Sequence, residues 1–386
     1  MPSLYIHFPF CLYKCHYCDF NSHARASDKI PFLEYAEALS AELAARRRLF
    51  EISGKHFFPT GSQLETVFFG GGTPSLMPPP ILEKILEEVG KYFVIDRETE
   101  VTLEANPGTL PPGWVFPGVN RLSLGVQSLH DAYLAAFGRI HTAEKAREAL
   151  RSIPKIFDSW SADLIFGFPG QTLKEWKEDL EEMIAFSPPH LSCYAFTVEK
   201  EAPYARMAAQ GSPLPDEDLQ AEMLEETRSR LEMAGYNRYE ISNFSRPGFE
   251  SRHNMNYWNY GSYLGIGAGA VSFFNEGELR YRTTNLKRPE EYMRAWGKSP
   301  LAPLFQRGEI ETIDHHTAKA EFMMMGLRLK RGIDPDRFKK LFGVSVDEAF
   351  GKAMGWARDK GWMEAGNPRL TSQGAHFSNQ VITSFL

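Results

Sequence analysis

Apolar and polar positions follow two different periods along the first half of the chain. Short apolar runs alternate with longer segments in which apolar residues recur every few positions, and glycine, proline or asparagine separates the two. The first pattern is typical of buried strands and the second of amphipathic helices. We expect strands at Leu4–Phe8, Val67–Phe69, Glu100–Glu104, Arg121–Val126, Ser161–Phe166 and Leu191–Phe196. We expect helices at Ile30–Phe50, Ile81–Phe93, Thr142–Ile153 and Leu173–Phe186.

Strands that alternate with helices predict parallel pairing and an α/β fold. The polar, glycine and cysteine residues of this half gather at or near the ends of the expected strands. In a parallel barrel the carboxyl ends of all strands share one face, and that face carries the active site. The sequence therefore predicts one site built from several segments: Cys11–Cys18, Gly70–Pro74, Glu104–Pro107, Gln127–Ser128, Asp163 and Gly167–Gly170.

The second half is less regular and predicts a different kind of domain at the C-terminus. A helix is expected at Asp216–Ala234, because Asp216 is a favourable N-cap and Gly235 follows the last turn. Beyond an aromatic and glycine-rich stretch we expect three helices, a hairpin and a last helix, which together resemble a winged-helix module. These helices are His315–Lys330, Asp336–Phe342 and Val346–Lys360, and the hairpin turns at Ala365–Pro368.

Length and composition are those of a globular protein with more than one domain. At roughly 150 residues per domain, 386 residues predict two or three domains, which we place at 1–200, 201–300 and 301–386. Hydrophobic residues make up 43% and charged residues 24%, which excludes a disordered or collagen-like chain. The net charge of −6 excludes a polybasic protein drawn to nucleic acid or anionic membrane. An excess of 11 basic over 7 acidic residues between His316 and Leu386 is too small to indicate nucleic-acid binding.

The N-terminus and the cysteines indicate where the protein works. Met1–Lys14 has no basic leader and no small-residue cleavage site, and no apolar run approaches the roughly 20 residues of a membrane span. Three of the four cysteines fall within eight residues and Cys193 stands alone, so they make a poor disulfide framework. A cytoplasmic, reducing compartment and a metal-binding role are therefore expected.

The spacing of Cys11, Cys15 and Cys18 predicts an iron–sulfur cluster. Thiolates are the usual ligands of such clusters, and three of them on a four-iron cluster leave one iron without a protein ligand. That iron can bind a substrate, as the open position of a catalytic zinc does. A structural zinc site, with His7 or His16 as the fourth ligand, is the alternative. It is disfavoured because such sites usually pair two separated ligand clusters.

The cysteines and the residues before them resemble a known family signature. Cys-x3-Cys-x2-Cys, preceded by Tyr5-Ile-His-Phe-Pro-Phe10, is similar to the motif of radical S-adenosylmethionine (SAM) enzymes. Within that superfamily the chain resembles the oxygen-independent coproporphyrinogen III oxidase family, and most closely its HemW-type heme chaperones. The resemblance covers nearly the whole chain. It implies an incomplete parallel (β/α)6 barrel with a C-terminal helical domain, and a 4Fe–4S cluster bound by the three cysteines.

The same resemblance assigns a SAM site. The segment Gly70–Pro74 would hold the SAM amino group, and its glycines let the backbone approach a ligand closely. A reduced cluster would cleave SAM to methionine and a 5′-deoxyadenosyl radical. Taken singly, the same residues also fit a tight turn, surface charges and core aromatics. The implied SAM contacts are Gly71, Gly72, Thr73, Glu104, Gln127, Arg139 and Asp163, and Tyr5 and Tyr17 would pack on the cluster or the adenine.

Two departures separate the chain from the oxidases of this family. The oxidases carry a further cysteine two residues after the third, where this chain has Phe20, and an N-terminal extension for which Tyr5 leaves no room. The stretch His253-Asn-Met-Asn-Tyr257-Trp258 instead matches the His-Asn-x-x-Tyr-Trp motif of the chaperones, whose histidine is implicated in heme binding. Imidazole is a common axial ligand of heme iron. The alternative is a hydrogen-bonded histidine in a packed aromatic loop.

The resemblance therefore implies a heme chaperone that binds a 4Fe–4S cluster, SAM and heme, and that transfers heme to apo-proteins of the respiratory chain. Its partners would be heme, the recipient apo-heme proteins and an electron donor such as flavodoxin or ferredoxin. Peripheral membrane contact and a dimer are further expectations, and nucleic acid is not expected. The alternative is a radical SAM oxidoreductase that acts on a porphyrinogen, although the two departures disfavour coproporphyrinogen oxidation.

Overall fold

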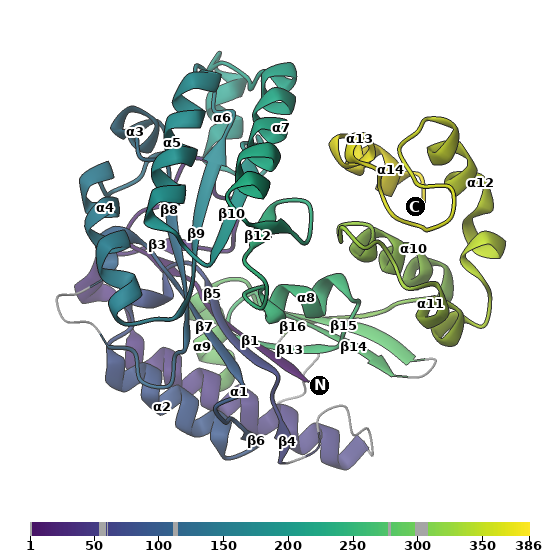
Figure 1. Ribbon diagram of the computed structural model, residues 1–386. Helices are drawn as coiled ribbons and strands as arrows, with labels where there is room; N and C mark the ends of the chain where they lie inside the picture. Colours follow the sequence, from purple (N-terminus) through teal and green to yellow (C-terminus); the bar gives the residue numbers. More distant parts are fainter. Residues whose placement is uncertain (1, 54–58, 60, 111–114, 277–278, 298–307) are drawn as a thin grey trace.

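The computed structural model describes residues 2–53, 59, 61–110, 115–276, 279–297 and 308–386 (Figure 1). Six parallel strands form the wall of an open barrel, and they lie side by side in the order in which they occur along the chain. This pairing confirms the predicted α/β fold. The six strands are β1 (Ser3–Phe8), β5 (Thr66–Gly71), β7 (Glu100–Ala105), β8 (Arg121–Gln127), β9 (Ser159–Phe166) and β10 (His190–Ala195).

Further strands extend this sheet at both edges. β13 (Tyr263–Ile266) pairs in parallel with β1, and β14 (Val271–Glu276), β15 (Leu279–Asn285) and β16 (Gly308–Thr312) follow it in antiparallel pairing. At the other edge β12 (Asn243–Ser245) and β11 (Asn237–Arg238) follow β10. The outer strands β11 and β16 lie at opposite ends of the strand order, so the barrel is incomplete, as predicted. Short pairs outside the sheet are β2 (Phe10–Cys11) with β3 (His23–Ala24), and β4 (Ser62–Gln63) with β6 (Phe93–Val94).

Helices cover the outside of the barrel wall, and a second group forms a C-terminal domain beyond β14–β16 (Figure 1). In the first group α1 packs against α2 and α9, and α5 packs against α7. The first group is α1 (Phe32–Ser53), α2 (Pro79–Gly90), α3 (Asp131–Phe137), α4 (Ala143–Ser152), α5 (Leu173–Phe186), α6 (Pro203–Ala209), α7 (Glu217–Met233), α8 (Arg252–Trp258) and α9 (Pro289–Gly297). The second group is α10 (His315–Gly326), α11 (Pro335–Phe342), α12 (Val346–Asp359), α13 (Ser372–His376) and α14 (Ser378–Thr383).

Local sequence signals explain where several helices begin. Thr172 and Glu175 form a capping box at the start of α5, each side chain accepting the backbone N–H of the other residue. Asp216 caps α7, as predicted. α2 begins at Pro79, two residues before the predicted Ile81, because proline is tolerated in a first turn whose N–H groups have no helical partner.

Two predicted boundaries differ for local reasons. α1 begins at Phe32 and not at Ile30, since a residue that precedes a proline is held away from the helical region. α10 ends at Gly326 and not at Lys330. After proline, glycine has the lowest helix propensity, so ending the helix at Gly326 costs little free energy.

The C-terminal domain is helical, but its predicted hairpin is not built from two strands. Within the described residues the segment around Ala365–Pro368 forms one antiparallel bridge, between Met363 and Leu370. Pro368 has no N–H to donate, which limits the ladder. The wing of the predicted winged-helix module is therefore reduced to a tight turn.

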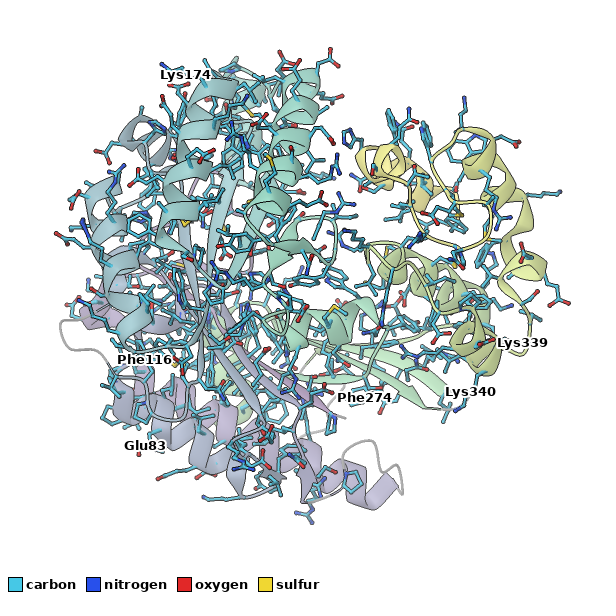
Figure 2. All side chains as sticks on the ribbon, viewed as in Figure 1. Glu83, Phe116, Lys174, Phe274, Lys339 and Lys340 are labelled. Carbon is cyan, nitrogen blue, oxygen red and sulfur yellow. The ribbon has the colours of Figure 1, made fainter. Side chains whose placement is uncertain are left out.

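Among the described residues, three hydrophobic clusters support the fold. The first fills the barrel wall and its helices and includes residues from both 1–200 and 201–300. The second lies among α10–α14 and also includes Tyr260 and Phe273. The third is smaller and consists of Phe137, Ile165, Phe168, Phe196 and Tyr204. Figure 2 shows Phe274 of β14 inside the fold, whereas Lys339 and Lys340 project from α11. Among the helices that the structure describes, none is both long and apolar enough to cross a membrane. The division at residues 200 and 300 stays a prediction.

A buried carboxylate joins α1 to the extended edge of the sheet. Glu42 is 0% exposed, and its two oxygens accept four hydrogen bonds. Arg46 Nε (2.6 Å) and Asn285 Nδ2 (2.7 Å) donate to Oε1, and Gly267 N (2.9 Å) and Tyr292 OH (2.7 Å) donate to Oε2. A buried ion survives only with such a full set of partners. Glu42 therefore fixes α1, α9 and the turn after β13 relative to one another.

The turn after β13 in turn contacts the cysteine segment. Tyr35 of α1 donates to the carbonyl of His7 (2.7 Å) and accepts from Ala268 N (2.8 Å). Asn21, three residues beyond the last clustered cysteine, donates through Nδ2 to the carbonyls of Ala268 and Lys287, both at 2.9 Å. The buried polar residues of α1 thus position the back of the cysteine segment.

Replacing Glu42 by alanine should lower the free energy of unfolding by about 3–5 kcal/mol, because it leaves the Arg46 guanidinium buried without its carboxylate. The measurement is chemical denaturation followed by circular dichroism. Glu37→Ala, an exposed change on the same helix, should stay within about 0.5 kcal/mol of the parent. A double Glu42→Leu/Arg46→Leu variant that recovers stability would confirm the unpaired charge as the cause, and equal stability of Glu42→Ala and Glu37→Ala would refute it.

Candidate functional site

A pocket at the carboxyl ends of the parallel strands collects most of the predicted site residues. They come from the segment after β1, from β5, β7, β8 and β9, and from the turn after α3. We call it the cysteine pocket. Tyr5 and His253 line an adjoining cavity that shares Glu104 and Asp163 with it. The predicted residues that line the cysteine pocket are Cys11, Cys15, Cys18, Tyr17, Gly71, Gly72, Thr73, Glu104, Gln127, Arg139 and Asp163.

The cysteine segment is held by backbone hydrogen bonds from two neighbouring helices. His16 N donates to the carbonyl of Phe137 at the end of α3 (2.9 Å), and Tyr204 N of α6 donates to the carbonyl of His16 (2.7 Å). Cys18 N closes a turn on the carbonyl of Cys15 (3.2 Å). All four cysteines are free thiols. The segment is therefore fixed by the protein fold and not by a disulfide.

Each thiol has a polar neighbour that can stabilise a thiolate. Burial raises the pKa of Cys11 to about 11 and also raises that of Cys18, where the nearby Lys14 charge opposes the effect. Because the thiolate is the metal ligand, cluster binding near neutral pH must release thiol protons. The neighbours are Thr73 Oγ1, donating to Cys11 Sγ at 3.4 Å, Arg139 Nη1, 3.6 Å from Cys15 Sγ, and Ser22 Oγ, 3.7 Å from Cys18 Sγ.

The alternative zinc site finds no support in the described residues. His7 Nε2 lies 2.9 Å from the carbonyl of Asn21 and its Nδ1 lies 2.9 Å from Tyr5 OH. His16 Nδ1 lies 2.9 Å from the carbonyl of Ala136. Across the part of the chain that the structure describes, no three histidine, cysteine or acidic side chains gather where one ion could bind them all. Cluster thiolates bind separate irons, so a cluster does not require three side chains that converge on one ion.

Arg139 is the fixed cation of the cysteine pocket. Its guanidinium donates to the carbonyl of Gly125 (2.7 Å), to Tyr17 OH (3.2 Å) and to Asn106 Oδ1. Asn106 in turn donates to Thr73 Oγ1 (3.1 Å). The sequence placed Asn106 in the predicted site segment Glu104–Pro107 but gave it no role of its own. Asn106 links the cation to the glycine-rich segment.

Two carboxyl groups face the pocket from neighbouring strands. Glu104 Oε2 accepts from Gly71 N (3.0 Å), and Asp163 Oδ2 accepts from Ser123 Oγ (3.1 Å). Burial raises the pKa of Glu104 to about 8, and the negative charge of Asp163 adds to the increase. Burial also raises the pKa of Asp163, while hydrogen bonds from Ser192 and Ser123 oppose the shift. Both groups can accept hydrogen bonds from amino or hydroxyl groups of a ligand.

Gln127 enters the pocket because β8 ends in an irregularity. The pairing register of β8 with β9 shifts between Gly125 and Gln127, and Gln127 has a φ of 72°. The residues that follow are fixed from outside by Asp179 of α5. Ser128 Oγ (2.7 Å) and Leu129 N (2.8 Å) both donate to its carboxylate. A buried acceptor on α5 therefore sets the position of Gln127.

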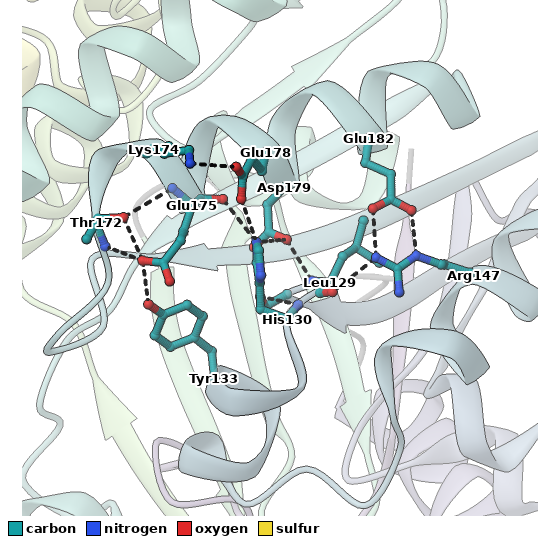
Figure 3. Close-up of polar contacts among 11 residues, drawn as sticks. Leu129, His130, Tyr133, Arg147, Thr172, Lys174, Glu175, Glu178, Asp179 and Glu182 are labelled. Atoms are coloured by element: carbon teal, nitrogen blue, oxygen red, sulfur yellow. Dashed lines mark hydrogen bonds and ion pairs between the residues drawn. The ribbon is translucent and has the colours of Figure 1, made fainter.

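The same face of α5 holds α3 and α4 (Figure 3). Tyr133 OH of α3 donates to Glu175 (2.7 Å), and Arg147 of α4 donates to both oxygens of Glu182 at 2.6 and 2.8 Å. His130 Nε2 lies 3.6 Å from Asp179. Because Arg139 follows α3 directly, these contacts also anchor the cation of the cysteine pocket.

His253 lies at the opposite end of the barrel interior from the cysteines, beside the first residue of β5. It is 1% exposed, with Nδ1 2.7 Å from Thr66 Oγ1 and Nε2 2.8 Å from Tyr257 OH. Its ring stacks on Phe68 with centroids 4.9 Å apart, and Tyr5 lies 6.2 Å away. Burial lowers the pKa of His253 to about 3, so the imidazole is neutral at physiological pH. Both ring nitrogens have partners in this arrangement.

Sequence comparisons agree with this geometry. A family model for the Radical SAM superfamily matches residues 5–183, and one for the HemN C-terminal domain matches residues 313–377. The heme chaperone HemW of Haemophilus influenzae is 36% identical over 100% of this chain and 97% of its own length. The heme chaperone HemW of Escherichia coli is 33% identical over 100% of this chain and 98% of its own. The mouse mitochondrial radical S-adenosyl methionine domain-containing protein 1 is 36% identical over 86% of this chain and 74% of its own.

A solved structure shares the fold. Coproporphyrinogen III oxidase (HemN) from Escherichia coli, a radical SAM enzyme, superposes with a TM-score of 0.80 at 20% identity, over 100% of this chain and 90% of its own. The cysteine pocket at the mouth of an incomplete parallel barrel defines a radical SAM protein, a superfamily that implies a 4Fe–4S cluster and SAM. The full-length identities narrow this class further. The chain belongs to the HemW heme chaperone family.

Replacing Cys11, Cys15 or Cys18 singly by alanine should remove most of the iron bound after anaerobic reconstitution, because each thiolate binds a separate iron. Iron and sulfide analysis with electron paramagnetic resonance (EPR) of the reduced protein measures this. The matched control is Cys193→Ala, since Cys193 is buried in β10 away from the pocket, and it should keep the parent iron content. Full iron content in any of the three variants would exclude that cysteine as a ligand.

Proposed function

We propose that this protein is a heme chaperone that binds a 4Fe–4S cluster and SAM in the cysteine pocket, binds heme, and transfers heme to apo-proteins. Full-length similarity to curated heme chaperones is the observation that carries the proposal. The adjoining cavity supports it, because Glu104 and Asp163 line both that cavity and the cysteine pocket, and His253 lines its other end. The barrel interior thus contains residues of both the cysteine motif, Cys11–Cys18, and the motif that begins at His253.

In the proposed SAM complex the chain's own residues supply position and charge. When bound, the reduced cluster supplies the electron that cleaves SAM. Arg139 meets the methionine carboxylate, and because Gly125 and Asn106 both accept from its Nη2, a fork on the carboxylate replaces one of these two hydrogen bonds. Glu104 and Asp163 accept from the amino group and the ribose hydroxyls. The remaining proposed contacts are Gly71, Gly72, Thr73, Gln127, Tyr17 and Tyr5.

Affinity for SAM should rise with pH between about 6.5 and 8 and level off above. Without SAM the pKa of Glu104 is about 8, so at neutral pH the carboxyl group must lose its proton to accept from SAM. Below that pKa, the affinity for SAM rises by nearly tenfold per pH unit if binding releases one proton. Calorimetric titrations of the reconstituted protein in buffers of different ionisation enthalpy measure both affinity and proton release.

Glu104→Gln should weaken SAM binding about tenfold or more at pH 8.5, because a charged hydrogen bond is lost, and should remove this proton release. Glu83→Gln, an exposed change on α2, serves as the control. The same pH slope in the parent and in Glu104→Gln would exclude Glu104 as its source.

Heme ligation by His253 would require a local rearrangement. Iron must take the place of one hydrogen-bond partner, either Thr66 at Nδ1 or Tyr257 at Nε2. His253 belongs to α8, a helix of seven residues, and its side chain is buried, so heme would have to reach it through the adjoining cavity. The hydrogen bonds of His253 to Thr66 and Tyr257 therefore compete with heme iron for the two ring nitrogens.

Tyr257→Phe should strengthen heme binding by about threefold to tenfold. The substitution removes the hydrogen bond between Tyr257 OH and His253 Nε2, which contributes about 1 kcal/mol net and competes with heme iron for that nitrogen. His253→Ala should weaken heme binding and remove the contribution of His253 to the imidazole-ligated Soret band. Anaerobic titration of the reconstituted protein with ferric heme, followed by transfer to an apo-heme protein, measures both effects. Unchanged heme affinity and spectrum in His253→Ala would exclude His253 as ligand. A parent protein that binds no more heme than an unrelated control would overturn the chaperone function.

The remaining partners follow from the same proposal. We propose apo-proteins of the respiratory chain as recipients, reached by peripheral membrane contact, an electron donor such as flavodoxin or ferredoxin, and a dimeric state. Oxidation of coproporphyrinogen is not proposed. Phe20 lies 61% exposed at the cysteine pocket, at the position where the resembled oxidases carry a further cysteine.

A further inference from the structure

A second cavity separates the barrel from the C-terminal domain. It has a volume of about 590 Å³ and is lined from one side by the ends of β9 and β10 and by α7, and from the other by α13 and α14. We call it the α7–α13 cleft. The apolar part of its barrel wall is formed by Phe166, Phe196, Val198 and Leu224, and Phe377 faces them from the C-terminal domain. The same wall also carries the polar side chains of Thr197, Glu217 and Gln220. A cavity of this size that combines aromatic walls with polar side chains can hold a small molecule.

His376 at the end of α13 supplies a polar group to this cleft. Its side chain is 27% exposed. Its Nε2 lies 3.8 Å from the carboxylate oxygen Oε2 of Glu225 on α7, within ion-pair range but too far for a hydrogen bond. His253, in contrast, has both ring nitrogens within hydrogen-bond distance of a hydroxyl. His376 can therefore bind a metal without first losing a hydrogen bond of its own.

We propose that the α7–α13 cleft docks heme, with His376 Nε2 as an axial ligand to the iron. The inference rests on the proposed heme function and names a place where heme binds the folded chain without rearrangement. Imidazole is a common heme ligand, and aromatic walls pack favourably on the edges and faces of a porphyrin. Asn379 and Gln380, exposed at the rim on α14, carry amide donors for the propionates.

The cleft is separate from the cysteine pocket, but a chain of packed aromatic rings connects their walls. Phe196 of the cleft wall lies 6.0 Å from Phe137, and Phe137 lies 5.4 Å from Tyr17, which lines the cysteine pocket. The cleft and the cysteine pocket share no lining residue. Heme in the cleft therefore leaves SAM binding intact, and this distinguishes it from a porphyrin that enters the barrel mouth.

The test is anaerobic titration of the cluster-reconstituted full chain with ferric heme, read by the Soret band and by EPR of the ferric iron. His376→Ala should raise the dissociation constant at least tenfold, or remove one equivalent of heme, and should change the ligand signature. Leu224→Trp, which fills the cleft and leaves His376 in place, should weaken binding in the same way. His316→Ala, an exposed histidine on the same domain, is the matched control. SAM affinity should be the same in all four proteins.

The outcomes separate this inference from the proposed function. Parent-like heme binding in both His376→Ala and Leu224→Trp overturns the cleft as a heme site. If only His253→Ala loses heme, the chaperone function stands and the cleft is excluded. If the parent protein binds no heme above an unrelated control, both proposals fail together.

Discussion

The buried carboxylate of Glu42 is the interaction on which the geometry of the site depends. It lies in the hydrophobic interior between α1 and the extended edge of the sheet, where an ion is tolerated only if every oxygen has donors. Its four donors come from α1, from the turn after β13, from β15 and from α9. Meeting this requirement fixes the turn after β13, and that turn holds Asn21 behind the cysteines. A polar constraint far from the pocket thus determines the pocket's back wall.

Burial also sets the charge of the barrel interior. The pKa of Cys11 is about 11, that of Glu104 about 8 and that of His253 about 3, and desolvation is the main cause in each case. All three groups are therefore largely neutral near pH 7, whereas Arg139 keeps its charge. Arg139 is thus a fixed cation beside the cysteines, which suits the anionic parts of a cluster and of SAM. Ligand binding and proton loss are consequently coupled in the cysteine pocket, where Cys11 and Glu104 must ionise, whereas His253 is already neutral near pH 7.

Features that depend on residues close together along the chain could be predicted from the sequence. Strand–helix alternation, the capping residues Thr172 and Asp216, and the gathering of chemistry at strand ends all follow from local pattern. Features that join distant segments could not be read in this way. Glu42 meets Tyr292 across 250 positions, and the burial of His253 depends on Thr66, 187 positions away. The motif itself contains Tyr257, the partner of Nε2, and a hydrogen-bonded histidine was the stated alternative, but the partner of Nδ1 could not be read from it because that contact depends on tertiary packing.

The paired backbone contacts of His16 have a consequence for how the three thiols are placed. With its N–H held by α3 and its carbonyl held by α6, the cysteine segment owes its order to the surrounding fold. In small zinc modules the metal itself supplies the free energy of folding, and its loss unfolds the chain. Here the conformational entropy of the loop is already lost when the barrel forms. The formation of the barrel, α3 and α6 therefore determines where the three thiols lie, a task that a small zinc module leaves to its metal.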